Sequence, residues 1–138
     1  MLSSSQFDRA AVENVLGLAS QMETAVRSPR GGTDLLKGKV LVAAFFEPST
    51  RTQGSFNAAM LRMGGTVVNI NSETSSAKKG ETLEDTVRVL EKYGDAIAMR
   101  HPMTGAALLA AQYASRPILN AGDGMLNVLQ ALVRVFRY

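Results

Sequence analysis

The chain has 138 residues, of which 46% are hydrophobic and 20% charged, a balance that indicates a globular protein with a sizeable core. It contains no cysteine, which excludes disulfides and zinc-thiolate sites and suits a reducing cytosol, so a cytoplasmic location is expected. The formal charge of +3 comes from scattered basic residues with few aromatic neighbours, and no stretch approaches the ~18 apolar residues of a membrane span. We therefore expect no nucleic-acid partner and no membrane partner.

The first half of the chain reads as helix, strand, helix. Apolar residues recur every three or four positions from Val12 to Val26, with Asp8 as a plausible N-cap. SPRGGTD (28–34) ends this helix, and the apolar run over 38–46 predicts a strand buried on both faces. After the polar turn EPSTRT, helical spacing from Thr52 ends at Gly64 and Gly65.

The alternation continues to the end of the chain. Strands are predicted at 66–70, 96–100 and 117–121, helices at 83–93 and 104–114, and a closing amphipathic helix at 126–138, with a polar loop at 71–80. Strands separated by helical crossovers form parallel sheets. The prediction is a single domain over residues 1–138, an α/β doubly wound fold with a four-stranded parallel sheet flanked by helices.

Four polar loops follow the predicted strands: EPSTRT, NSETSSAKKG, RHPMTG and NAGDG. In doubly wound domains the carboxyl ends of the strands share one edge, where ligands bind. We expect these four loops to meet there.

The turn EPSTRT is rich in groups that bind anions, namely Ser49, Thr50, Arg51 and Thr52. At the start of a helix the free N–H groups and the positive end of the helix dipole face the turn, and Arg51 can hold two phosphate oxygens. The turn therefore predicts a phosphate site. The local sequence leaves an alternative open, in which Ser49 or Thr50 only caps the helix and Arg51 makes a surface ion pair.

Arg100 and His101 stand at the end of a predicted strand. Arg100 is placed to bring positive charge to an anion at that edge. His101, the only histidine, is a base, a ligand or a satisfied polar residue, and the structural role is favoured. Glu47 and Asp123 are isolated carboxylates and do not define a metal site.

Four segments resemble the carbamoyl-phosphate-binding half of the aspartate carbamoyltransferase catalytic chain. They are, in order, FFEPSTRTQGSFNAAMLRMGG, SSAKKGETLEDT, AIAMRHP and PILNAGDG. The resemblance runs from about Phe7 to Gly124. STRT followed by SF is shared with ornithine carbamoyltransferase, whereas KKGETLEDT resembles the aspartate enzyme.

The resemblance implies a role for each matching residue. The residues that would bind the phosphate of carbamoyl phosphate are Ser49, Thr50, Arg51 and Thr52. Thr52 and Arg100 would also lie close to the carbamoyl group, as the catalytic pair. Ser75 and Lys79 would reach the site of a neighbouring subunit in a homotrimer; the alternative for this basic loop is an ordinary solvated loop.

The reaction implied by the resemblance is attack of the aspartate amine on the carbamoyl carbon, an early step of pyrimidine synthesis. It needs no cofactor and no metal, because positioning and positive groups around the departing phosphate supply the catalysis. By this alignment His101 is not the active-site histidine of the family.

After NAGDG the chain departs from the family pattern. The family continues with His-Pro-Thr-Gln, whereas this chain reads MLNVLQALVRVFRY, so Gln130 is an insecure match for the family glutamine. We also expect the aspartate-binding domain of the family to be absent from these 138 residues. We therefore expect a carbamoyl-phosphate-binding domain with little activity alone; the alternatives are a catalytic chain completed by another polypeptide and an oligomerising scaffold.

Overall fold

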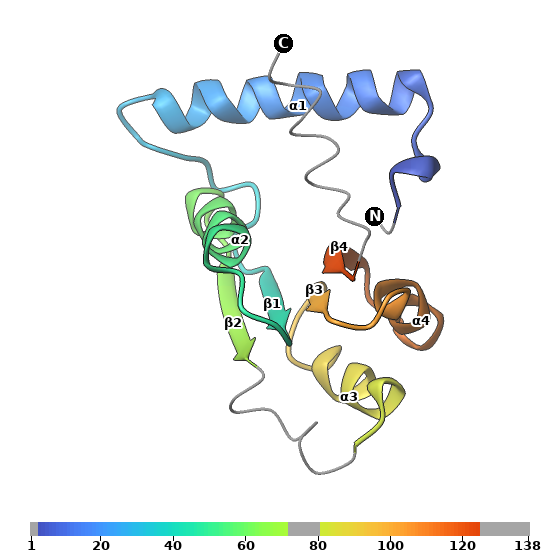
Figure 1. Cartoon of the computed structure of the whole chain (residues 1–138). Coiled ribbons are helices and arrows are strands. Elements are labelled where there is room, and N and C mark those ends of the chain that lie inside the picture. The colour runs from blue at the N-terminus through green and yellow to red at the C-terminus, as the bar shows by residue number, and fades with distance from the viewer. Residues whose placement is uncertain (1–2, 72–80, 125–138) are drawn as a thin grey trace.

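The computed structural model describes residues 3–71 and 81–124. In chain order the elements are a 3-10 helix η1 (Ser4–Gln6), α1 (Arg9–Arg27), β1 (Val40–Phe45), α2 (Thr50–Arg62), β2 (Thr66–Asn71), α3 (Leu83–Leu90), β3 (Ala96–His101), α4 (Ala106–Tyr113) and β4 (Ile118–Asp123) (Figure 1). Each strand and helix predicted within these residues is present, and only η1 was not expected.

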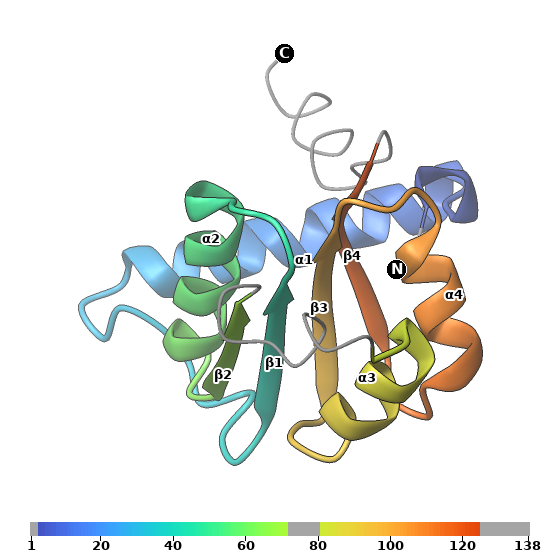
Figure 2. The same cartoon turned by 60° about the horizontal axis from the view of Figure 1, so that its bottom comes forward.

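The strands form one parallel sheet in the order β2-β1-β3-β4. Figure 2 shows all the arrowheads at one edge, with the turn into α2 beside the end of β3. Phe45, the last residue of β1, is in register with Asn71 of β2 and Arg100 of β3. The predicted four-stranded parallel α/β fold is confirmed.

Helices cover both faces of the sheet, as the continuous apolar run of β1 predicts. Alternate residues of β1 point to opposite faces: Val42 and Ala44 pack with Val87 and Leu90 of α3, while Leu41 packs with residues of the α2 side. Leu41 to Phe45 are all buried. This double burial makes β1 a rigid base for the turn that follows it.

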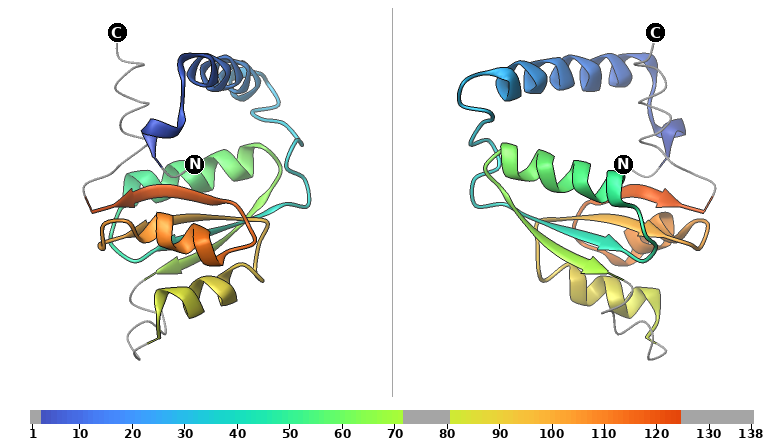
Figure 3. Two further views of the ribbon diagram at one scale, coloured as in Figure 1. Left: turned by 90° about the vertical axis from the view of Figure 1, so that its right-hand side faces the viewer. Right: turned by 60° about the vertical axis from the view of Figure 1, so that its left-hand side comes forward.

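Helix α1 lies outside this core, beyond α2 (Figure 3). Asp8 caps it, accepting a hydrogen bond from the Ala11 N–H at 2.7 Å, as predicted. None of its residues is buried, although Val12, Val15 and Met22 on the predicted apolar face are half-buried. No helix within the described ranges is long and apolar enough to cross a bilayer.

Most boundaries differ from the prediction by one to three residues, and two of the differences bear on the candidate site. Helix α2 begins at Thr50 rather than Thr52, because its first turn is polar and apolar spacing detects only the part from Phe56 onward. It ends as expected, with Gly64 in the left-handed region at φ +80. Strand β4 runs on to Asp123, so most of NAGDG is strand rather than loop.

Candidate functional site

The turn between β1 and α2 places the positive end of a helix at the carboxyl edge of the sheet. Ser49 is at the N-cap position, with φ −156 and ψ 73, but its side chain makes no capping hydrogen bond. The caps of α1 and α3 do make such bonds. The Ser49 hydroxyl therefore does not cap the start of α2, in contrast to the capping role that the sequence left open.

A polar pocket of about 460 Å³ opens over this turn, and it is lined by Pro48, Ser49, Thr50, Arg51, Thr52 and Arg100. All of these except Pro48 are the phosphate-site residues predicted within the described ranges. The turn and the first residues of α2 supply five of the six, and β3 supplies Arg100. The parallel pairing of β1 with β3 brings these two segments together, since Arg100 is in register with the end of β1. Arg51 is exposed and has no ion-pair partner among the described residues.

The guanidinium of Arg100 is held from two sides. Its Nη2 lies 2.6 Å from Oε1 of Glu47, and its Nη1 donates a hydrogen bond to the Ala121 carbonyl of β4 at 3.2 Å. Its Nε is buried without a hydrogen-bond partner. The side chain is 22% exposed. Two of the three guanidinium nitrogens therefore have acceptors, and the buried Nε has none.

His101 does not line the pocket. Its ring packs on Phe46 with centroids 5.3 Å apart, and its Nδ1 accepts a hydrogen bond from the Met103 N–H at 3.0 Å. Burial lowers the pKa of His101 below its ordinary value, against the opposing charges of Glu47 and Asp123. The Nδ1 bond to Met103 helps to form the turn after β3, which favours the structural role expected for His101.

Asp123 is also buried and hydrogen-bonded within the domain. It is 2% exposed, and its carboxylate accepts hydrogen bonds from Asn120 Nδ2 at 3.0 Å and from the Gly105 N–H, at the start of α4, at 3.1 Å. These bonds explain why β4 continues through a polar residue. Within the described ranges no group of three or more His, Cys, Asp or Glu side chains is arranged to hold a metal ion.

A layer of amides fixes α2, and with it the turn, on the edge strand. Gln53 Nε2 donates to Asn69 Oδ1 at 3.0 Å and to Asn71 Oδ1 at 3.1 Å, and Asn57 Nδ2 donates to Asn69 Oδ1 at 3.0 Å. Residue Gln53 lies one turn after Ser49, whose carbonyl accepts its N–H. The start of the helix is thus tied to β2 by side chains that apolar spacing does not reveal.

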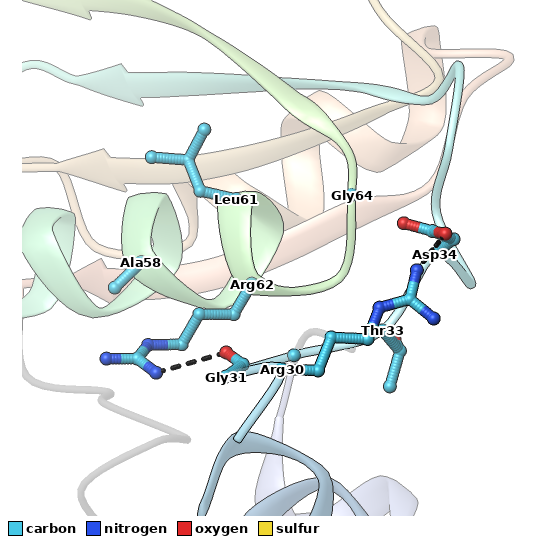
Figure 4. Close-up of a pocket in the computed structure, with 9 residues that line it drawn as sticks. Arg30, Gly31, Thr33, Asp34, Ala58, Leu61, Arg62 and Gly64 are labelled. Carbon is cyan, nitrogen blue, oxygen red and sulfur yellow. Dashed lines mark hydrogen bonds and ion pairs between the residues drawn. The ribbon is translucent and has the colours of Figure 1, made fainter. Parts of the chain in front are cut away.

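A larger pocket, of about 560 Å³, lies at the other end of α2 (Figure 4). There Arg30 is paired with Asp34, and Arg62 Nη1 donates to the Gly31 carbonyl at 3.2 Å. The negative end of the helix dipole faces this pocket, and both guanidinium groups already have acceptors. It is therefore a poorer anion site than the smaller pocket at the strand ends.

Three predicted features lie outside the described residues: the neighbour-reaching pair Ser75 and Lys79, the insecure match Gln130 and the closing helix 126–138. Glu47 is the site residue that sequence reasoning missed, because it was weighed only as a metal ligand. Opposite charges that follow two strands, Glu47 after one and Arg100 at the end of another, were the available signal.

The sequence profile of the family described as aspartate/ornithine carbamoyltransferase, carbamoyl-P binding domain, matches residues 1–136. The multifunctional protein pyr1-3 of Dictyostelium discoideum is 50% identical over 99% of this chain, which covers 6% of that protein. The aspartate carbamoyltransferase catalytic subunit of Alkaliphilus metalliredigens is 49% identical over 90% of this chain, which covers 39% of that subunit. The chain thus spans two fifths or less of these relatives.

Solved structures give the same result. Aspartate transcarbamoylase from Trypanosoma cruzi in complex with carbamoyl phosphate has a TM-score of 0.91 at 44% identity, covering 98% of this chain and 42% of that one. The same enzyme in complex with carbamoyl aspartate and phosphate has a TM-score of 0.91 at 44% identity, covering 98% of this chain and 44% of that one. With the profile covering residues 1–136, this chain belongs to the aspartate/ornithine carbamoyltransferase family.

Proposed function

We propose that this chain binds carbamoyl phosphate, or phosphate alone, in the pocket at the start of α2. One observation carries the proposal: Arg100 of β3 and the hydroxyl-rich turn before α2 line the same polar pocket. The Trypanosoma cruzi enzyme was crystallised with carbamoyl phosphate and with phosphate. Helix dipole, free hydroxyls and two guanidinium groups are the chemistry that a phosphate dianion requires.

The proposed roles follow from the placement of each group. Ser49, Thr50 and Arg51 bind the phosphate oxygens, while Thr52 and Arg100 lie toward the carbamoyl group. In the family reaction a C–N bond to the aspartate amine forms, the C–O bond to phosphate breaks, and the amine loses a proton. The positive groups would stabilise the charge that develops on the departing phosphate, without a cofactor or metal.

The site is proposed to be completed by a second copy of the chain in a homotrimer, to which the neighbour contributes Ser75 and Lys79. The 138-residue polypeptide alone is proposed to turn over little substrate, because it corresponds to about two fifths of the catalytic subunits it matches. Without a domain that positions aspartate, the reaction loses a lowering of the activation barrier worth ~7–11 kcal/mol. A colorimetric assay for carbamoyl aspartate on the pure chain tests this, and robust turnover would contradict it.

Residues 126–138 are proposed to close the same domain as a helix, so that residues 1–138 form one unit. The half-buried apolar side chains of α1, including Val15 and Met22, offer a face for it. A Met22→Asp substitution should then lower the unfolding midpoint of the full chain but not that of a chain ending at Gly124. An equal decrease of the unfolding midpoint in both chains would contradict the proposal.

Calorimetry is the direct test of binding. Carbamoyl phosphate and inorganic phosphate should both bind the wild-type chain, and Arg51→Ala should weaken each by about tenfold or more, since one charge-assisted contact is worth ~1.5–3 kcal/mol. Arg27→Ala on α1, a side chain paired with Glu23, is the matched loss of one positive charge and should change little. Equal affinity of the wild type and Arg51→Ala would reject this pocket.

A further inference from the structure

The end of β4 carries an extra residue opposite Arg100. Strand β4 has two residues where β3 has only Arg100, between the in-register pairs Met99–Asn120 and His101–Asp123. This is a β-bulge, an irregularity that changes the direction of the backbone and is frequent beside binding sites. The two residues are Ala121 and Gly122, and Gly122 has φ +127, a value that residues with a side chain rarely adopt.

Two buried polar side chains flank this bulge and hold it. Asn120 is 3% exposed and Asp123 is 2% exposed. Asn120 Oδ1 accepts a hydrogen bond from the Gly122 N–H at 2.8 Å, and its Nδ2 donates to Asp123 Oδ1 at 3.0 Å. The second carboxylate oxygen of Asp123 accepts from the Gly105 N–H at 3.1 Å. Because a buried polar group is costly without its partners, these bonds fix the bulge and join it to the start of α4.

The bulge also sets the position of the Ala121 carbonyl. Ala121 is fully buried, and its carbonyl accepts the hydrogen bond from Arg100 Nη1 at 3.2 Å. A binding group that is already held in place loses less conformational entropy when the ligand arrives. The affinity of the pocket for an anion should therefore depend on the bulge, through the orientation of the Arg100 guanidinium.

We propose that Asn120 and Asp123 are positioning residues of the anion pocket: their hydrogen bonds hold the bulge of β4, and the bulge holds Arg100 through the Ala121 carbonyl. The inference rests on the proposed phosphate site and adds to it two residues that do not line the pocket. The sign of one effect separates this role from simple electrostatics. If Asp123 acted only through its negative charge, its removal would tighten anion binding, whereas loss of a positioning residue weakens it.

The test is calorimetry with inorganic phosphate on the full chain. Asn120→Ala removes both bonds of the amide and should weaken phosphate binding about three- to tenfold, the effect of one hydrogen bond that no longer orients a binding group. Asp123→Asn keeps the size of the side chain and should also weaken binding, although a negative charge is lost. Wild-type or tighter binding by either variant would overturn the proposal.

A control variant separates affinity from stability, because both substitutions should also lower the unfolding temperature. Glu91→Gln disturbs another buried carboxylate, which bonds Ser115 N and Oγ before the start of β4, at the opposite edge of the sheet from the pocket. It should lower the unfolding temperature and leave phosphate affinity within about twofold of wild type. A loss of affinity as large as that of Asn120→Ala would attribute the effect to general destabilisation and contradict the proposal.

Exchanging the two residues provides a rescue. In Asn120→Asp/Asp123→Asn the bond between the side chains is reversed, with the amide donating from position 123 to a carboxylate at position 120, and acceptors remain for the N–H groups of Gly122 and Gly105. This double variant should bind phosphate more tightly than Asp123→Asn and within about twofold of wild type. Recovery of the unfolding temperature without recovery of affinity would refute the positioning role.

The effect must also depend on Arg100. In an Arg100→Ala background the loss caused by Asn120→Ala should fall below about twofold, and a full loss there would show that the bulge does not act through Arg100. The failure of this inference is distinguishable from that of the phosphate site. If wild type binds phosphate, Arg51→Ala binds it weakly and Asn120→Ala equals wild type, only the positioning role fails; if wild type does not bind phosphate, the site fails and the positioning role with it.

Discussion

The contacts of Arg100 depend on the planar shape of its guanidinium group as well as on its charge. One nitrogen reaches the Ala121 carbonyl at 3.2 Å, another reaches Glu47 at 2.6 Å, and the third faces no partner. Only a planar fork can hold these directions together, since an ammonium group is a single point donor. The residue therefore connects the turn after β1 with β3 and β4 at the edge where the proposed ligand binds.

This geometry predicts the outcome of Arg100→Lys. The charge is kept but the fork is lost, so phosphate affinity should fall by about tenfold, the equivalent of one charge-assisted hydrogen bond. Arg88→Lys is the control, because Arg88 lies over the Tyr113 ring on the far face of the sheet, 5.5 Å from its centroid. Calorimetry with inorganic phosphate checks both, and unchanged affinity in Arg100→Lys would show that charge alone suffices.

At the scale of elements, two helix starts are used differently. Thr82 caps α3 by accepting a hydrogen bond from the Asp85 N–H at 3.2 Å, whereas Ser49 makes no such bond at the start of α2. Thr82→Ala should therefore lower the free energy of unfolding by about 1 kcal/mol, while Ser49→Ala should change it by less than ~0.5 kcal/mol and weaken phosphate binding. Urea unfolding and calorimetry measure the two effects. Equal destabilisation by both variants would make Ser49 an ordinary cap.

Helix α3 is fastened at its other end by Glu91, which is 8% exposed. Its carboxylate contacts Lys92 at 2.7 Å and accepts hydrogen bonds from Ser115 N and Oγ at 2.7 and 2.8 Å. The Lys92 contact, followed by the Ser115 bonds, lowers the pKa of Glu91 from 4.5 to about 2. Because the folded-state pKa is the lower one, the stability from this carboxylate is complete above pH 4.5 and is lost as the pH falls toward 2.

Glu91→Gln should accordingly be less stable than wild type at pH 7, and the difference should shrink progressively below pH 4.5. Urea unfolding of both proteins at several pH values measures it. Glu23→Gln, which removes an exposed carboxylate on α1, should show a small difference that does not depend on this window. A difference in the free energy of unfolding between Glu91→Gln and wild type that stays constant down to pH 2 would contradict the lowered pKa of Glu91.

The fold was predictable because the apolar runs of β1 and β3 are buried, and because the apolar spacing of α3 matches its buried Val87 and Leu90. The start of α2 was not located correctly, since Ser49 to Gln53 contain no apolar residue. The end of β4 was missed because Asp123 stays in the sheet through hydrogen bonds to Asn120 and Gly105. The spacing of apolar residues carries no information about such polar contacts. Polar continuation of an element depends on tertiary partners, which a one-dimensional pattern does not contain.

The site was predictable to a similar extent. The turn 49–52 and Arg100 could be expected at one edge, because parallel strands collect their carboxyl ends there. The pairing of Glu47 with Arg100 could not, because it depends on β1 and β3 being neighbours in the order β2-β1-β3-β4. Strand order is set by the packing of the helices between the strands.

At the scale of the whole molecule, the proposed trimer makes the site a shared property of two chains. Light scattering should give the mass of three chains, and Lys79→Ala should weaken phosphate binding in the trimer as Arg51→Ala does. A stable monomer that binds phosphate with undiminished affinity would contradict both the trimer and the shared site.

A mixing experiment tests the sharing itself. When Arg51→Ala and Lys79→Ala chains are unfolded together, mixed in equal amounts and refolded, each trimer assembles at random. A site then recovers when an intact cradle from a Lys79→Ala chain meets an intact loop from an Arg51→Ala neighbour, which happens for about one quarter of the sites. Calorimetry should find this fraction binding with wild-type affinity, although neither variant does so alone. No recovery in mixed trimers of confirmed mass would place Lys79 in the same chain's site or outside the site altogether.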